Sequence, residues 1–131
     1  MFASYNPPEL GDFSASGTSV GAGTEELVYA LGLAIDAETG RRRADAATVG
    51  DETRVCFDNI RRILAEAGLG LADIAKTTCY LQDEEHRFEF FEAYKEHFGD
   101  GPYPARVTVI VGIASDCRVQ IEAIAVPHDA Q

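Results

Sequence analysis

The stretch GPYPARVTVIVGIASDCRVQIEAIAVP, residues 101–127, decides the fold that the sequence predicts. Pro102 and Pro104 fix a turn and exclude a helix at its start. From Arg106 onward, side chains alternate with a period of two up to a break at 114–116, and a second alternating run follows. Two strands joined by so short a break predict an antiparallel hairpin.

Arg106 is the most informative residue of this stretch, because it opens an otherwise apolar strand directly after the proline turn. Its guanidinium is a planar fork of donors that suits a carboxylate. Gln120 and Glu122 share one face of the following strand, since they are two residues apart. A hairpin would bring the cation and these groups to one end of a cleft. The alternative is an edge salt bridge between Arg106 and Glu122.

Upstream of this stretch, residues 48–67 form the clearest helix. Apolar residues recur there at spacings of three and four, and Thr48 with Asp51 resembles a capping box. Gly68 ends the helix as a C-terminal cap residue. The apolar run 26–35 predicts a buried strand, with a short helix as the alternative.

A strand at 74–82 and a second helix follow. Asp83 is placed to cap that helix, which we expect to reach Phe98 and to turn Phe88 and Phe91 inward. The order of strands and helices predicts a single α+β domain over residues 1–131, with both helices on one face of a mixed sheet. The opposite face carries Ile110, Ile124 and Val126, and an uncovered apolar face predicts oligomerisation.

The two ends of the chain are expected to be less regular than the middle. Residues 1–23 are rich in glycine, proline and serine, which predicts loops with one short strand at 13–16. Residues 127–131 are expected to form a tail.

Composition limits the function classes. The net charge of −11 argues against a nucleic-acid partner, and the basic cluster at 41–43 is interpreted as a solvated loop. The absence of a long apolar run predicts no membrane association and a cytoplasmic protein. Three cysteines without a CxxC motif fit free thiols. Neither a metal site nor a cofactor is indicated by the sequence.

Several motifs together resemble the Rid (reactive intermediate deaminase, YjgF-type) family. The resemblance covers residues 50–126 well and the first part of the chain poorly. It is carried by Pro104-Ala105-Arg106 with the alternating valines, by Val119–Ala125, by Lys76–Leu81, by Asn59-Ile60 with Leu64 and Ala67-Gly68, and by Phe88 with Tyr94 and Phe98.

The resemblance implies a chorismate-mutase-like subunit and a homotrimer with clefts at the subunit interfaces. It implies that Arg106 binds the carboxylate of a small imino or enamino acid. The family's water-activating glutamate corresponds to Gln120 here, and a carboxamide cannot act as a base near neutral pH. Phe13, Leu31 and Phe91 stand where the family often has polar groups. If these positions line the cleft, the pocket is apolar; the alternative is a shifted alignment of the first half.

Three functions follow as hypotheses. The first is a Rid-like deaminase that hydrolyses an imine to a carbonyl compound and ammonia, with Arg106 as the anchor and with Gln120 or backbone groups placing the water. The second is an enzyme with other, pathway-specific chemistry on an unstable intermediate. The third is a trimeric protein that binds a small carboxylate without catalysis. The glutamine at position 120 keeps the second and third open.

Overall fold

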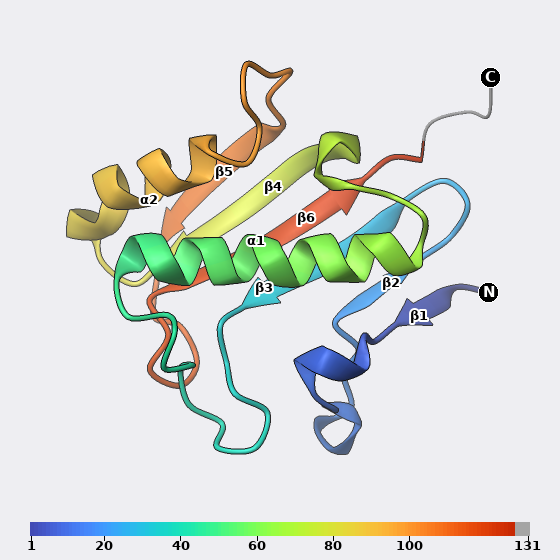
Figure 1. The fold of residues 1–131 in the computed structure, drawn as a ribbon, viewed down its shortest axis with the longest axis horizontal. Coiled ribbons are helices and arrows are strands. Elements are labelled where there is room, and N and C mark those ends of the chain that lie inside the picture. Colours follow the sequence, from blue (N-terminus) through green and yellow to red (C-terminus); the bar gives the residue numbers. More distant parts are fainter. Residues whose placement is uncertain (128–131) are drawn as a thin grey trace.

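The structure is a computed structural model that describes residues 1–127, so residues 128–131 of the predicted tail lie outside the described part. It contains one six-stranded mixed sheet with two α-helices on one of its faces, which confirms the predicted α+β class (Figure 1). The elements are β1 (Ala3–Tyr5), β2 (Gly21–Gly23), β3 (Val28–Leu33), α1 (Val49–Glu66), β4 (Ile74–Leu81), α2 (Arg87–Lys95), β5 (Ala105–Ile110) and β6 (Val119–Ala125).

The predicted hairpin of the two C-terminal strands is wrong. The strands lie in the order β1-β2-β3-β6-β4-β5, and β5 pairs in parallel with β4 while β6 lies between β3 and β4. Leu81 at the end of β4 is flanked by Ile110 on one side and by Val119 on the other. β5 ends earlier than its alternation suggested, so residues 111–118 are long enough to pass the end of β4.

Helix α1 has the boundaries and the buried stripe that its sequence predicts. The Thr48 side chain accepts a hydrogen bond from the Asp51 N–H at 3.0 Å, and the Asp51 carboxylate accepts one from the Thr48 N–H at 3.4 Å. Gly68 follows the helix with a φ of +75°, which favours glycine. Phe57 and Ile60 are fully buried against the sheet. Within residues 1–127, neither helix combines the length and apolar character that crossing a bilayer requires.

Residues 1–23 contain β1 and β2 rather than the single strand predicted at 13–16, where the chain forms a 3-10 helix, Ser14–Ser16. β2 has the sequence Gly-Ala-Gly, which has a low intrinsic strand propensity. A Cβ atom on Gly21 would lie 2.2 Å from Cγ2 of Ile63. Close packing against α1 therefore selects glycine, and tertiary packing overrides the local preference.

Helix α2 is shorter than predicted. Asp83 caps a 3-10 turn, and the α-helix begins only after it. Phe88 was expected inside but is 78% exposed, whereas Phe90 and Tyr94 are buried. Phe91, which is also expected inside, packs against the core, so the departure from the predicted stripe lies in the first turn of α2, directly after the 3-10 turn.

The face of the sheet without helices is the second surface of the domain. Val107, Tyr29 and Ile124 lie on it, and Val107 and Tyr29 are about half exposed. Ile110 was expected on this face, but it pairs with the buried Leu81 and lies on the helical side. The predicted hairpin pairs β5 with β6, whereas β5 pairs with β4, and the face of Ile110 is therefore the opposite of the predicted one.

A buried carboxylate links α1 to the start of β6. Glu52 is fully buried and accepts hydrogen bonds from the Arg118 N–H at 2.7 Å, the Val119 N–H at 2.9 Å and Arg118 Nε at 2.8 Å. Arg118 Nη2 also donates to the carbonyl oxygens of Ala46 and Ala47. This contact determines where β6 enters the sheet, and it compensates the desolvation of the charge.

We predict that Glu52→Ala lowers the free energy of unfolding by about 3–5 kcal/mol, because it removes the charge that is paired with Arg118 and leaves Arg118 Nε and two backbone N–H groups without their acceptor. Denaturant unfolding measures the loss. Glu66→Ala, an exposed carboxylate at the end of the same helix, is the control and should change the value by less than about 0.5 kcal/mol. A loss below about 1 kcal/mol for Glu52→Ala would contradict this account.

Candidate functional site

Arg106 lies on the edge strand β5 and points toward α2. It pairs with the buried Thr77 of β4, which faces the helices. The Arg106 guanidinium carbon lies 4.3 Å from the centre of the Phe91 ring and 4.7 Å from that of the Tyr94 ring. The structure thus brings the predicted site residues Arg106 and Phe91 together, as a cation against two aromatic faces.

Of the two rings that contact Arg106, the Tyr94 ring is held in place by buried contacts. The hydroxyl groups of Tyr94 and Thr77 are 2.8 Å apart in a buried hydrogen bond, and the Tyr94 ring packs edge-on against Phe57 of α1. Burial raises the pKa of the Tyr94 phenol, so the ring under the cation stays neutral. Among residues 1–127, Arg106 forms no ion pair, and its side chain is exposed. The guanidinium is therefore available to an external carboxylate.

Phe13, Leu31 and Gln120, the other predicted site residues, line one apolar pocket of about 110 Å³. Leu31 comes from β3 and Gln120 from β6, and the two strands are neighbours in the sheet. The other lining residues are Leu10, Thr18, Ser19, Val20, Leu33, Ile35 and Asn59. The chain therefore places two carboxamides, those of Gln120 and Asn59, beside a small, mostly hydrocarbon-lined space.

Gln120 also lines a more open cavity of about 480 Å³, which Leu31 shares. Tyr80 of β4 and Glu122 of β6 contribute its other polar side chains, and the Tyr80 hydroxyl donates a hydrogen bond to Glu122 Oε1. Tyr80 lies directly across from Gln120 in the β4–β6 register. The bond to Glu122 raises the pKa of the Tyr80 phenol, since the carboxylate stabilises its neutral form. Sequence reasoning missed this pair, because it depends on which strand neighbours β6.

The predicted meeting of Arg106 with Gln120 and Glu122 does not occur within one chain. Arg106 is on the helical side of the sheet, whereas Gln120 and Glu122 are on the open side. Arg106 and Gln120 are also separated by two strand spacings and by three residues along β4, each about 10 Å. The alternative edge salt bridge is likewise absent from residues 1–127, and Glu122 is bonded to Tyr80 instead.

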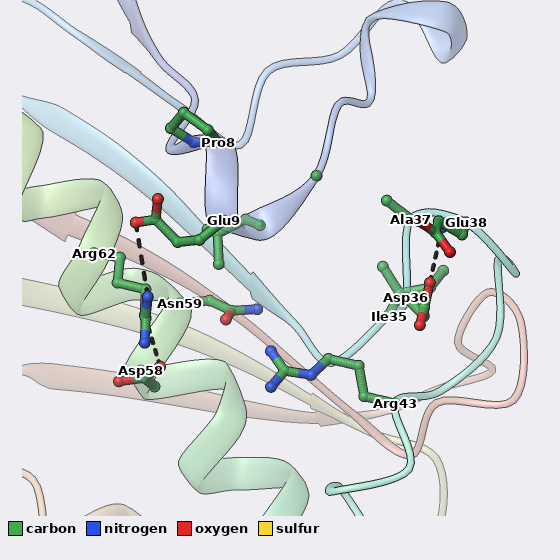
Figure 2. Close-up of a pocket in the computed structure, with 12 residues that line it drawn as sticks. Pro8, Glu9, Ile35, Asp36, Ala37, Glu38, Arg43, Asp58, Asn59 and Arg62 are labelled. Carbon is green, nitrogen blue, oxygen red and sulfur yellow. Dashed lines mark hydrogen bonds and ion pairs between the residues drawn. The ribbon is translucent and has the colours of Figure 1, made fainter.

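A polar cavity of about 490 Å³ adjoins the apolar pocket, and Leu10, Ile35 and Asn59 line both. Figure 2 shows Arg62 between Glu9 and Asp58, and Asn59 on the same helix reaching toward the middle of the cavity. Asn59 Nδ2 donates to a backbone carbonyl of β3 at 3.2 Å, and its buried Oδ1 has no partner among the described residues. One unused hydrogen-bond acceptor therefore lies at the boundary between the two spaces.

The cysteines do not offer a nucleophile. Cys56, Cys79 and Cys117 are free and buried. Burial raises the pKa of the Cys79 thiol to about 12 and that of Cys117 to about 11. The reactive thiolate is therefore scarce near neutral pH, and the thiols act as small core side chains.

We predict that iodoacetamide labels none of the three thiols rapidly in the folded protein near neutral pH, and labels all of them after unfolding. As the pH rises above 9.0, the unfolded chain releases the Cys79 proton first, so the stability from its neutral thiol is lost between 9.0 and about 12. Mass spectrometry measures the labelling and denaturant melts the stability. Labelling of Cys79 in the folded protein at the rate of a free thiol would contradict its burial.

The sequence of this chain is similar to those of known proteins. The family model described as Endoribonuclease L-PSP matches residues 9–127. The chain belongs to this family, the Rid (YjgF-type) proteins. Its Rid relatives include a RutC family protein of Pyrococcus horikoshii, 36% identical over 95% of this chain and 94% of the relative. Another is the 2-iminobutanoate/2-iminopropanoate deaminase of Escherichia coli, 33% identical over 72% of this chain and 73% of that enzyme.

Solved structures of Rid proteins have the same fold. The structure of Escherichia coli TdcF with bound serine is 28% identical, has a TM-score of 0.72, and covers 85% of this chain and 88% of that one. The chorismate-mutase-like fold that the motifs implied is thereby confirmed. The first half of the chain, whose resemblance was thin, is included in the family match.

Proposed function

We propose that the protein is a Rid deaminase that hydrolyses the C=N bond of a small reactive imino or enamino acid, which yields a carbonyl compound and ammonia. The observation that supports this most strongly is the Arg106 guanidinium. It is exposed, lies against two aromatic rings, and has no carboxylate partner within residues 1–127. Such a cation suits the carboxylate of an amino-acid-like substrate.

The proposed cleft needs two copies of the chain. Arg106 and Gln120 lie on opposite faces of the sheet, so one subunit cannot present both to one small molecule. A second copy that packs on the open apolar face would bring its Arg106 edge toward the pocket lined by Phe13, Leu31 and Gln120. Repetition of this contact between unlike surfaces closes a ring, and a homotrimer is the ring we propose.

The apolar pocket supports a substrate with a hydrocarbon side chain. Its volume of about 110 Å³ is smaller than the ~150 Å³ apolar cavity that holds benzene. We therefore propose branched aliphatic imino acids as the preferred class. In this arrangement the Gln120 amide would orient the water, since it can donate and accept hydrogen bonds. A protonated imine is reactive enough that positioning supplies much of the rate.

Two other functions are less well supported. RNA cleavage, which the family description names, requires a basic surface, but the net charge is −11 and Arg43 of the basic cluster is paired with Asp45 through two hydrogen bonds. Carboxylate binding without catalysis is favoured by the carboxamide at position 120. It predicts the same dependence on Arg106 for binding, but no turnover.

The test is imine hydrolysis with the substrate generated in place by an amino-acid oxidase and trapped by semicarbazide. We expect the protein to reduce adduct formation, most strongly for branched aliphatic side chains. Arg106→Ala should lower kcat/KM by about 10–100-fold, because it removes charge-assisted hydrogen bonds to the carboxylate. Arg61→Ala, an exposed arginine of α1, is the matched control. Full activity of Arg106→Ala, or no activity of the wild type with any side chain, would overturn the proposal.

A further inference from the structure

The open face of the sheet carries a hydrogen-bonded pair of acid groups beside Gln120. The Tyr80 hydroxyl donates to Glu122 Oε1, and both side chains are partly buried. Tyr80 is the direct neighbour of Gln120 across the β4–β6 ladder, and Glu122 lies two residues beyond Gln120 on the same face. All three line one cavity of about 480 Å³. A water held by the Gln120 amide in this cavity would therefore be near the Tyr80 oxygen.

The Tyr80–Glu122 pair can supply the proton acceptor that Gln120 cannot provide. Water addition to an imine releases a proton, and a neutral carboxamide cannot accept it. Glu122 is the only carboxylate that lines this cavity among the described residues. Its link to the cavity beside Gln120 runs through the Tyr80 hydroxyl, whose oxygen keeps a lone pair while its hydrogen is donated.

We propose that Tyr80 and Glu122 form the proton relay of this enzyme, with Tyr80 in contact with the attacking water and Glu122 as the proton acceptor behind it. The inference rests on the proposed imine hydrolysis. It assigns to this pair the proton transfer that Gln120 cannot perform, and it leaves Gln120 to hold the water.

Every proton that the relay accepts is returned over the two halves of the reaction, which are water addition and loss of ammonia. The water oxygen bonds to the carbon of the protonated imine, the C=N π electrons move to nitrogen, one water proton passes to the Tyr80 oxygen, and the Tyr80 proton passes to Glu122. In the second half, the proton returns through Tyr80 to the nitrogen of the carbinolamine. The C–N bond then breaks and its electron pair leaves on nitrogen. The hydroxyl oxygen forms the carbonyl, its proton passes along the relay, and ammonia carries it away as ammonium.

The protonation state of Tyr80 fits a role in proton transfer. The carboxylate of Glu122 raises the pKa of the phenol, so Tyr80 is neutral and carries the proton that the relay transfers. Thr78 and Val109 are its other neighbours on β4 and β5, and neither is titratable. The competing interpretation is that the two groups only satisfy each other's hydrogen-bonding needs on a surface that a second subunit covers.

The experiment compares Tyr80→Phe and Glu122→Gln with the wild type in the semicarbazide assay. We expect each variant to lose about 100-fold in kcat with little change in KM, because proton transfer is removed and substrate binding is kept. Glu26→Gln, an exposed carboxylate in the turn before β3, is the matched control. Circular dichroism and unfolding midpoints verify that each variant is folded.

Rescue of activity by a second substitution distinguishes a proton relay from a Tyr80–Glu122 pair that only stabilises the structure. Adding Gln120→Glu to Tyr80→Phe supplies a base at the water, so the double variant should regain most of the lost kcat. Tyr80→Phe with wild-type kcat, or a loss that Gln120→Glu does not rescue, would overturn the relay while the deaminase proposal stands. An inactive wild-type protein would remove both proposals together.

Discussion

The fold depends on one buried ionic contact, that of Glu52 with Arg118 and the backbone N–H groups where β6 begins. An unpaired carboxylate in this position would cost several kcal/mol, so the start of β6 has to lie against the first turns of α1. β6 thereby becomes the central strand between β3 and β4. Val119, whose N–H also bonds to Glu52, is buried on the helical side, so Gln120 and Glu122, one and three residues later, face the open side.

The second constraint is the sheet itself, which separates the two halves of the candidate site. Arg106 belongs to the helical side, where the Phe91 and Tyr94 rings hold it, and Gln120 belongs to the open side. Neither half contains an anchor and a water-positioning group together. Assembly of copies is therefore part of the proposed catalytic arrangement, and the open face, with its half-exposed Val107 and Tyr29, provides the surface on which it would occur.

Local patterns predicted local structure well and long-range pairing poorly. The capping box at Thr48 and the stripe of α1 could be predicted, because both depend on residues within a few positions of each other. The position of β6 could not, since a period of two identifies the two faces of a strand but not its neighbours. A signal for Glu52 was present, because it lies three residues after Val49 and four before Cys56, on the buried stripe. A charge on such a stripe predicts a buried partner, but not its identity.

Mixing two variants tests the central claim that each cleft takes Arg106 from one chain and Gln120 from another. Arg106→Ala and Gln120→Leu are purified separately, unfolded together and refolded, and imine hydrolysis is measured. If the cleft is shared, about a quarter of the clefts in randomly mixed rings contain both native residues, and activity rises well above that of either variant alone. If the mixture is no more active than the two variants measured separately, the two residues do not act together across an interface, and the account is contradicted.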